Sequence, residues 1–179
     1  MLKWLKDRRK NQRIRDEFYG RIVALSRHPL PYAEWGVPDT LEGRFEMLTL
    51  CMFLVLERLR RAGPQGAQTA QGLTDTFFAD MDAAHRQLGV GDLKVPRRMR
   101  QLADAFGARL QAYRQALESG GPGEFAAAIT RHFSEHAGDT KVQSMQITDC
   151  AISLLRELEA CPPETLLADA GGILSCNRQ

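Results

Sequence analysis

The sequence of 179 residues lacks the patterns that mark membrane-spanning helices, signal peptides and common nucleophiles. Its longest nearly apolar run, Met47–Leu56, is about half of the ~20 residues that a helix needs to cross a bilayer, so we expect a core helix there. Met1–Arg15 has no apolar stretch of the kind found in signal peptides, and no GxSxG motif occurs. The cysteines show no CxxC pair and no metal-site spacing, and we interpret them as small hydrophobic residues in a reducing compartment: Cys51, Cys150, Cys161 and Cys176.

The chain also lacks a strong excess of charge of either sign. It has 24 Lys and Arg against 22 Asp and Glu, and the net charge of +2 is too small to predict a specific nucleic-acid partner. With 44% hydrophobic and 26% charged residues the chain can bury a core, and its length fits one domain. The distribution of charge is uneven, because Met1–Arg15 holds seven Lys and Arg and one Asp.

Strand-like alternation is absent, whereas apolar residues recur every three or four positions, which predicts helices. We expect one all-α domain of about six helices packed as an irregular bundle. The expected helices lie at about 12–27, 41–62, 69–88, 96–118, 124–136 and 140–160. We divide the chain into a basic amphipathic segment (1–11), a helical domain (12–161) and a tail (162–179).

Turn and cap residues set the expected boundaries. Asp39 followed three positions later by Glu42 is typical of a capping box at the start of a helix. Gly63–Gly66 and Ser119–Gly123 are rich in glycine and proline and are interpreted as linkers. Gly89 is expected to supply a left-handed stop at the end of a helix.

The expected helix at 41–62 is apolar nearly all round. Such a helix is either the central core helix, which we favour, or offers a second apolar face as a groove for a partner helix. Arg44 lies near its N-terminus, where a cation opposes the helix dipole, so we expect Arg44 to have an acidic partner.

The N-terminal segment combines basic residues with a few apolar ones. Leu2 and Leu5 would share one face of a helix, with Trp4 beside them, which favours a peripheral contact with an anionic membrane surface or with a partner. The alternative is a frayed, solvated terminus. The residues expected at a membrane surface are Leu2, Lys3, Trp4, Leu5, Lys6, Arg8, Arg9 and Lys10.

The stretch Phe77–Arg100 joins two expected helices and concentrates charge. Its acids are Asp80, Asp82 and Asp92, and its bases include Lys94, Arg97, Arg98 and Arg100. Cations at a helix N-terminus are unfavourable for stability. Either the nearby acids neutralise the three arginines, or the arginines bind an acidic partner.

Two further patterns resemble metal sites only superficially. His132 and His136 lie four residues apart with Asp139 close behind, but no further ligand is evident, and we interpret them as a polar helix end. Asp80 and Asp82 are two residues apart and would point in different directions on a helix. We therefore expect no metal, no cofactor and no enzyme activity.

Three segments together resemble the ubiquinol–cytochrome c chaperone family: Tyr32–Met47 (YAEWGVPDTLEGRFEM), Phe78–Val95 (FADMDAAHRQLGVGDLKV) and Arg97–Tyr113 (RRMRQLADAFGARLQAY). Phe18–Ser26 also resembles the opening helix of that family. The sets GVPDT with GRF and DMD with GVGDL are the specific part of the likeness. It covers about Asp16–Leu117 well and the rest loosely.

The resemblance implies a non-enzymatic chaperone that binds newly made cytochrome b, holds it for haem insertion and assists assembly of the cytochrome bc1 complex. Mitochondrial members act with a small partner protein and at the ribosome exit, so these are further candidate partners. The family commonly has Phe-Tyr-Gly-Arg where this chain has Phe106-Gly107-Ala108-Arg109, so one aromatic is missing. No long presequence precedes the helical pattern, which favours a bacterial cytoplasmic protein, peripheral at the inner membrane.

We expect two surfaces to contact a client or partner: the charged stretch Phe77–Arg100 and the expected loop Tyr32–Thr40, which holds the aromatic residues Tyr32 and Trp35. The alternative function is that of a generic helical adaptor at the cytoplasmic membrane surface. The expected contact residues are Trp35, Asp39, Arg44, Asp80, Asp82, Asp92, Arg97, Arg98 and Arg100.

Overall fold

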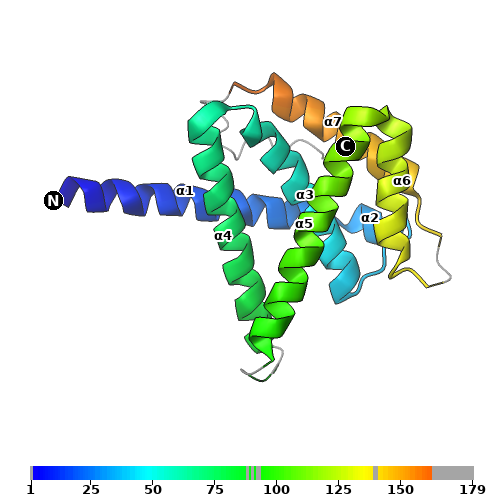
Figure 1. Ribbon diagram of the computed structural model, residues 1–179, viewed down its shortest axis with the longest axis horizontal. Coiled ribbons are helices and arrows are strands. Elements are labelled where there is room, and N and C mark those ends of the chain that lie inside the picture. Colours follow the sequence, from blue (N-terminus) through cyan, green and yellow to red (C-terminus); the bar gives the residue numbers. More distant parts are fainter. Residues whose placement is uncertain (1, 88, 90, 92–93, 139–140, 163–179) are drawn as a thin grey trace.

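The computed structural model describes residues 2–87, 89, 91, 94–138 and 141–162, with side chains from residue 12 onward (Figure 1). The described residues form seven helices and no strand, which confirms the prediction of a single all-α domain. The helices are α1 (Leu2–Ser26), α2 (Pro29–Ala33), α3 (Leu41–Arg60), α4 (Gly63–Gln87), α5 (Val95–Ser119), α6 (Gly121–Ser134) and α7 (Ser144–Ala160).

Helix α3 is the centre of the bundle, as its apolar composition predicts. It contacts α1, α4, α5, α6 and α7, and Figure 1 places it among them. Every residue from Glu46 to Leu59 is buried, because apolar side chains face all sides of this stretch. The interpretation as a core helix is therefore correct, and the buried stretch leaves no second face for a partner.

An aromatic cluster joins α3 to the hairpin of α4 and α5. The Phe77 and Phe106 rings stack with centroids 4.6 Å apart, and the Phe53 and Tyr113 rings lie 5.4 Å apart. All four side chains are buried. Figure 1 shows the two helices converging toward the lower end of the view, where α4 ends and α5 begins.

The two glycine-rich stretches are helix starts, and their interpretation as linkers was wrong. Helix α4 begins at Gly63 and α6 begins at Gly121, both with positive φ (72° and 66°) that lets the chain turn sharply. Proline follows each glycine in the first turn, where its missing N–H costs no hydrogen bond. A Cβ at Gly66 would lie 2.2 Å from the Leu59 carbonyl oxygen, so α3 and α4 meet in a tight corner.

The N-terminal half of the chain also differs from the sequence prediction. Helix α1 begins at Leu2 instead of residue 12, and Figure 1 shows its first half extending beyond the other helices. A short helix, α2, occupies part of the expected loop; its prolines lie within the first turn, which tolerates them. Helix α7 begins at Ser144, four residues later than expected. Gly89 has the predicted left-handed φ of 74° after α4.

Candidate functional site

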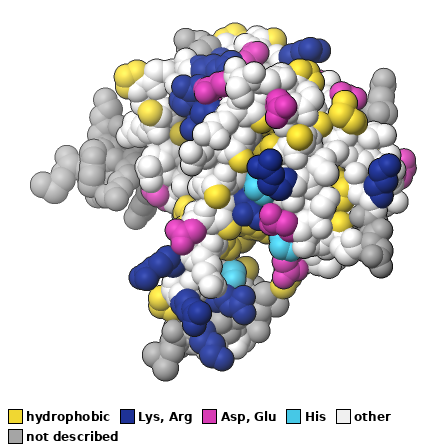
Figure 2. Space-filling model, turned by 45° about the vertical axis from the view of Figure 1, so that its right-hand side comes forward, with side chains coloured by type: hydrophobic (Ala, Val, Ile, Leu, Met, Phe, Trp, Pro, Cys, Tyr) yellow, Lys and Arg dark blue, Asp and Glu magenta, His cyan; other side chains and the backbone are white. Residues whose placement is uncertain are grey.

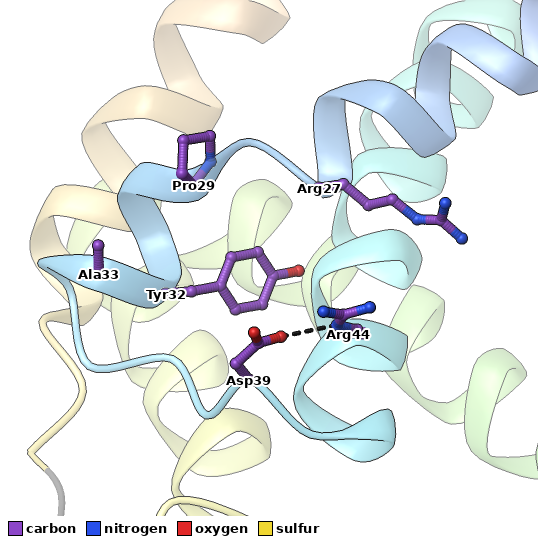
Figure 3. Close-up of a pocket in the computed structure, with 6 residues that line it drawn as sticks. All are labelled: Arg27, Pro29, Tyr32, Ala33, Asp39 and Arg44. Atoms are coloured by element: carbon purple, nitrogen blue, oxygen red, sulfur yellow. Dashed lines mark hydrogen bonds and ion pairs between the residues drawn. The ribbon is translucent and has the colours of Figure 1, made fainter.

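A surface pocket of about 420 Å³ lies where α1, α2 and α3 meet (Figure 3). Its walls combine two arginines, one acid, one aromatic ring and two small apolar residues. The lining residues are Arg27, Pro29, Tyr32, Ala33, Asp39 and Arg44. The sequence singled out Asp39 and Arg44 as contact residues, and the structure brings them together here.

The expected acidic partner of Arg44 is Asp39. The Arg44 Nε donates to the Asp39 Oδ1 over 2.6 Å, and this hydrogen bond lowers the pKa of the Asp39 carboxyl. Both side chains are more than half exposed, so water screens the pair. The predicted capping box was wrong by one position, because the Thr40 Oγ1 accepts the hydrogen bond from the Gly43 N–H (3.2 Å) at the start of α3.

Sequence reasoning missed four of the six lining residues, and the two of these with polar side chains are Arg27 and Tyr32. The Tyr32 Oη donates to the Ser26 carbonyl oxygen over 2.6 Å, which fixes the ring between α1 and α3, and burial raises the pKa of Tyr32 to about 12. The sequence did hold a signal for both residues. Arg27 lies at the end of the first expected helix, and Tyr32 follows five positions later, after the two prolines that end that helix. What the sequence could not show is that the break folds as α2 and turns Tyr32 toward Arg44.

Trp35 does not line this pocket. Its ring is partly buried against the core, and its carbonyl oxygen accepts from the Gln143 N–H over 2.8 Å. The Gln143 Nε2 also donates to the Glu34 carbonyl oxygen (2.8 Å), so this loop is fastened to the N-terminus of α7.

The most exposed large apolar side chains of the described residues, Leu41 (65%) and Met145 (51%), lie at the starts of α3 and α7.

The turn between α4 and α5 carries a second cluster of expected contact residues. Arg97, Arg98 and Arg100 are exposed in the first turns of α5 and form no ion pair with any described residue. Pro96 lies in the first turn of this helix, where a missing N–H costs no hydrogen bond. Figure 2 shows Lys and Arg side chains gathered at this end of the molecule.

The acids of the same stretch have partners other than the three arginines. Asp80 accepts from the Tyr19 Oη over 2.8 Å, and burial, followed by this hydrogen bond, raises the pKa of Tyr19. Asp82 forms an ion pair with Arg86, four positions further along the same helix, at 2.8 Å. Asp92 lies outside the described residues. Asp80 thus links α4 to α1, and Asp82 pairs within α4. Neither acid neutralises the arginines at the start of α5, which remain available to a partner.

A buried carboxylate that the sequence did not flag lies between α3, α5 and α6. Glu46 is 0% exposed, and Arg109 binds it through Nε (3.2 Å) and Nη2 (2.9 Å). Burial raises the pKa of Glu46, and the hydrogen bonds from Arg109 only partly offset this effect. Arg109 also contacts Glu135 at 3.1 Å, and His136 lies 3.6 Å from Glu46.

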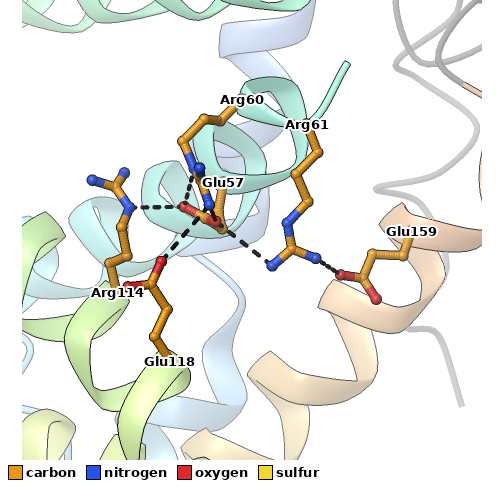
Figure 4. A network of polar contacts seen from close by, with 6 residues as sticks. All are labelled: Glu57, Arg60, Arg61, Arg114, Glu118 and Glu159. Atoms are coloured by element: carbon orange, nitrogen blue, oxygen red, sulfur yellow. Dashed lines mark hydrogen bonds and ion pairs between the residues drawn. The ribbon is translucent and has the colours of Figure 1, made fainter. Parts of the chain in front are cut away.

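A second network surrounds Glu57 near the other end of α3 (Figure 4). The Arg60 Nη2 and the Arg114 Nε bind the Glu57 carboxylate over 2.6 and 3.0 Å, and Arg61 bridges Glu57 to Glu159 of α7. Burial raises the pKa of Glu57, but the hydrogen bonds from Arg60 and Arg114 outweigh it and lower the pKa overall.

Arg58, the neighbour of Glu57, closes the C-terminal end of α7. Its Nε and Nη2 donate to the carbonyl oxygens of Leu158 and Cys161, each over 2.8 Å. A cation there satisfies carbonyl groups that the helix leaves unpaired. Three buried charged residues of α3 thus hold the bundle together, because Glu46 and Glu57 bind arginines of α5 and Arg58 binds carbonyl groups at the end of α7.

Of the two histidines near the end of α6, His132 is buried within the bundle and His136, just beyond the helix, is exposed. The His132 ring meets the Tyr113 ring edge-on (centroids 5.6 Å apart), and burial lowers the pKa of His132. Neither ring nitrogen of His132 has a hydrogen-bond partner among the described residues. The same part of the chain shows no group of three His, Cys, Asp or Glu residues placed to hold a metal ion, and none of its helices could cross a membrane.

Comparisons with known proteins give two matches. The model of a family described as ubiquinol-cytochrome C chaperone matches residues 33–171. The crystal structure of the Cbp3 homolog from Brucella abortus is similar to this fold, with 35% sequence identity and a TM-score of 0.81. The likeness covers 94% of this chain and 93% of that one. No curated protein sequence matches the chain.

Proposed function

Because the chain belongs to the ubiquinol–cytochrome c chaperone family, we propose that it binds newly made cytochrome b and assists assembly of the cytochrome bc1 complex without enzyme activity. The observation that carries the proposal is the family match over residues 33–171. The likeness of nearly the whole chain to the Cbp3 homolog, at 35% sequence identity, supports it.

Two surfaces are proposed for client or partner contact. The first is the surface around the α1–α2–α3 pocket, with Asp39 and Arg44 on its wall and Trp35 on the neighbouring loop. The second is the basic cluster of Arg97, Arg98 and Arg100, with Asp92, Asp80 and Asp82 in the same hairpin. Three exposed cations that no described acid neutralises are unfavourable at the start of a helix, and an acidic partner would relieve this.

We further propose that the protein works at the cytoplasmic face of a bacterial inner membrane. Residues 2–10 include five Lys and Arg, and α1 carries this segment beyond the bundle (Figure 1). Basic residues close to an anionic membrane surface contribute about 1 kcal/mol each. Such binding would hold the chaperone near a client that is itself inserted in the membrane.

The test reverses the charge of the basic cluster. The triple variant Arg97→Glu, Arg98→Glu and Arg100→Glu is expected to capture less cytochrome b in a pull-down with tagged client and to lower the amount of assembled bc1 complex. These side chains are exposed, so helicity and thermal unfolding should stay close to those of the wild type.

The matched control makes the same change of charge elsewhere, at the exposed Arg21, Arg131 and Arg156. It should capture cytochrome b like the wild type. Equal capture by both triple variants would count against the basic cluster. A wild-type protein that captures other membrane proteins but no cytochrome b would refute the proposed function and favour a generic adaptor.

A further inference from the structure

Most residues around the α1–α2–α3 pocket have a structural reason to be there. Gly43 must lack a side chain, because a Cβ would lie 2.0 Å from the Pro38 carbonyl oxygen. Thr40 caps α3, and Val37 is buried. The pair of Asp39 and Arg44 differs, because it is exposed on the pocket wall and such pairs add little to stability.

The pocket has more hydrogen-bond donors than the protein uses. Arg44 donates to Asp39 only through its Nε, so its two terminal amino groups have no partner within the described part of the chain. Arg27, on the rim, forms no ion pair with a described acid. The lining thus holds two arginines and one acid, a net positive charge; Figure 3 shows the Arg44 guanidinium beside Asp39, whereas the Arg27 side chain points away from that pair. The free edge of an arginine side chain matches the geometry of a second carboxylate.

The rest of the lining is apolar. Figure 3 shows the Tyr32 ring in the middle of the pocket, with Pro29 and Ala33 on α2 beside it and the Asp39–Arg44 pair below it. The hydroxyl of Tyr32 is already used by Ser26, so the ring presents its face for apolar contact. A volume of about 420 Å³ lies within the range of roughly 300–1,000 Å³ that is typical of binding pockets.

We propose that this pocket binds a peptide segment in which an acidic side chain lies next to an apolar or aromatic one. The carboxylate binds the terminal amino groups of Arg44 with support from Arg27, and the apolar side chain packs on Tyr32. Asp39 holds the Arg44 side chain in place and at the same time competes with the incoming carboxylate. The inference rests on the proposed function in that the cytochrome b client is the expected source of the segment.

The test uses a fluorescent, end-capped pentapeptide, Ala-Phe-Glu-Leu-Ala, and its counterpart with Gln in place of Glu. Fluorescence polarisation should give at least about tenfold tighter binding of the Glu peptide, as expected for a charge-assisted hydrogen bond. Arg44→Gln should abolish this preference and Arg27→Gln should reduce it. Asp39→Asn should strengthen binding of the Glu peptide, because it removes the competing negative charge.

Arg13→Gln is the matched control, since Arg13 is an exposed arginine of α1 that pairs with Glu17 away from the pocket. It should leave the preference unchanged. Opposite effects of Arg44→Gln and Asp39→Asn do not arise from unfolding, and circular dichroism of each variant checks the fold. Equal binding of both peptides by the wild type, or an unchanged preference in Arg44→Gln, would overturn the inference.

A pull-down of cytochrome b with the same proteins separates this inference from the proposed function. Capture of cytochrome b by a wild type that shows no peptide preference refutes the pocket alone. Failure of the wild type to capture cytochrome b refutes the proposed function. Reduced capture by Arg44→Gln, with capture by Arg13→Gln intact, supports both.

Discussion

The buried pair of Glu46 and Arg109 gives the sharpest test of how this bundle is stabilised. The side chain of Glu46 is 1% exposed and that of Arg109 is 14% exposed. We consider Arg109→Met, which keeps most of the side-chain volume and removes the charge. The variant leaves the Glu46 carboxylate buried without its arginine partner, with the His136 ring 3.6 Å away.

Removing one partner of a buried ion pair typically costs about 3–5 kcal/mol, because the other charge stays buried without compensation. At about 2–4 °C per kcal/mol for a domain of this size, the midpoint of thermal unfolding should fall by roughly 6–20 °C. Glu46→Gln should cost less, about 1–3 kcal/mol, because Arg109 keeps its contact with Glu135 (3.1 Å) and reaches water.

The double variant, Glu46→Gln with Arg109→Met, should be more stable than Arg109→Met alone. It leaves no buried charge unpaired at this site, and a buried pair as a whole contributes little compared with neutral side chains of similar size. Chemical unfolding of all four proteins, at matched slopes, measures the coupling free energy between the two residues. Losses that simply add in the double variant would refute this account of the pair.

The pH dependence of Arg109→Met has a definite sign. Burial already raises the pKa of Glu46 in the folded protein, and loss of Arg109 raises it further. A carboxyl whose folded pKa exceeds its unfolded pKa contributes stability below the unfolded pKa and loses it as pH rises through the folded one. The stability gap between the variant and the wild type should therefore widen from pH 5 to pH 8.

Two further predictions concern packing and burial. Gly43→Ala should destabilise the protein by about 1–3 kcal/mol, because the new Cβ clashes with Pro38. Gly107→Ala should stabilise α5 by up to about 1 kcal/mol, because no atom lies within 4 Å of the new Cβ. Thermal unfolding measures both shifts, and shifts of the same sign would contradict the argument. Cys51 should resist alkylation in the native protein, because burial raises its pKa to about 12, and mass spectrometry would contradict this if it labelled Cys51 as fast as the partly exposed Cys161.

The core could be predicted from the sequence because its signal is local. The apolar spacing of 41–62 and its lack of a polar face predict the buried α3 correctly. Helix ends were harder, since they depend on geometry that single residues do not specify. Glycine and proline at Gly63–Gly66 fit a linker or a helix start equally well, and the tight contact of Gly66 with Leu59 decides for the latter.

The buried networks could not be predicted because each joins residues that are distant in the sequence. Glu46 and Arg109 are 63 positions apart, and nothing near either residue indicates the other. One signal was available: a charged residue inside a helix that is apolar all round must itself be buried and needs a partner. The pocket combines both cases, because the Asp39–Arg44 pair is local and predictable, whereas the placement of Arg27 and Tyr32 depends on the unexpected α2.

The position of Arg58 has a consequence for how the chain reaches its native state. Ribosomes make α3 early, yet its buried guanidinium binds carbonyl groups 100 and 103 positions further along. Contacts of such long sequence separation form late, because closing the loop costs entropy before any contact is gained. Until α7 is synthesised, α3 lacks one of the helices that cover it and exposes apolar surface that favours aggregation. A protein proposed to bind an unfinished client therefore itself exposes apolar surface during its synthesis, until α7 packs against α3.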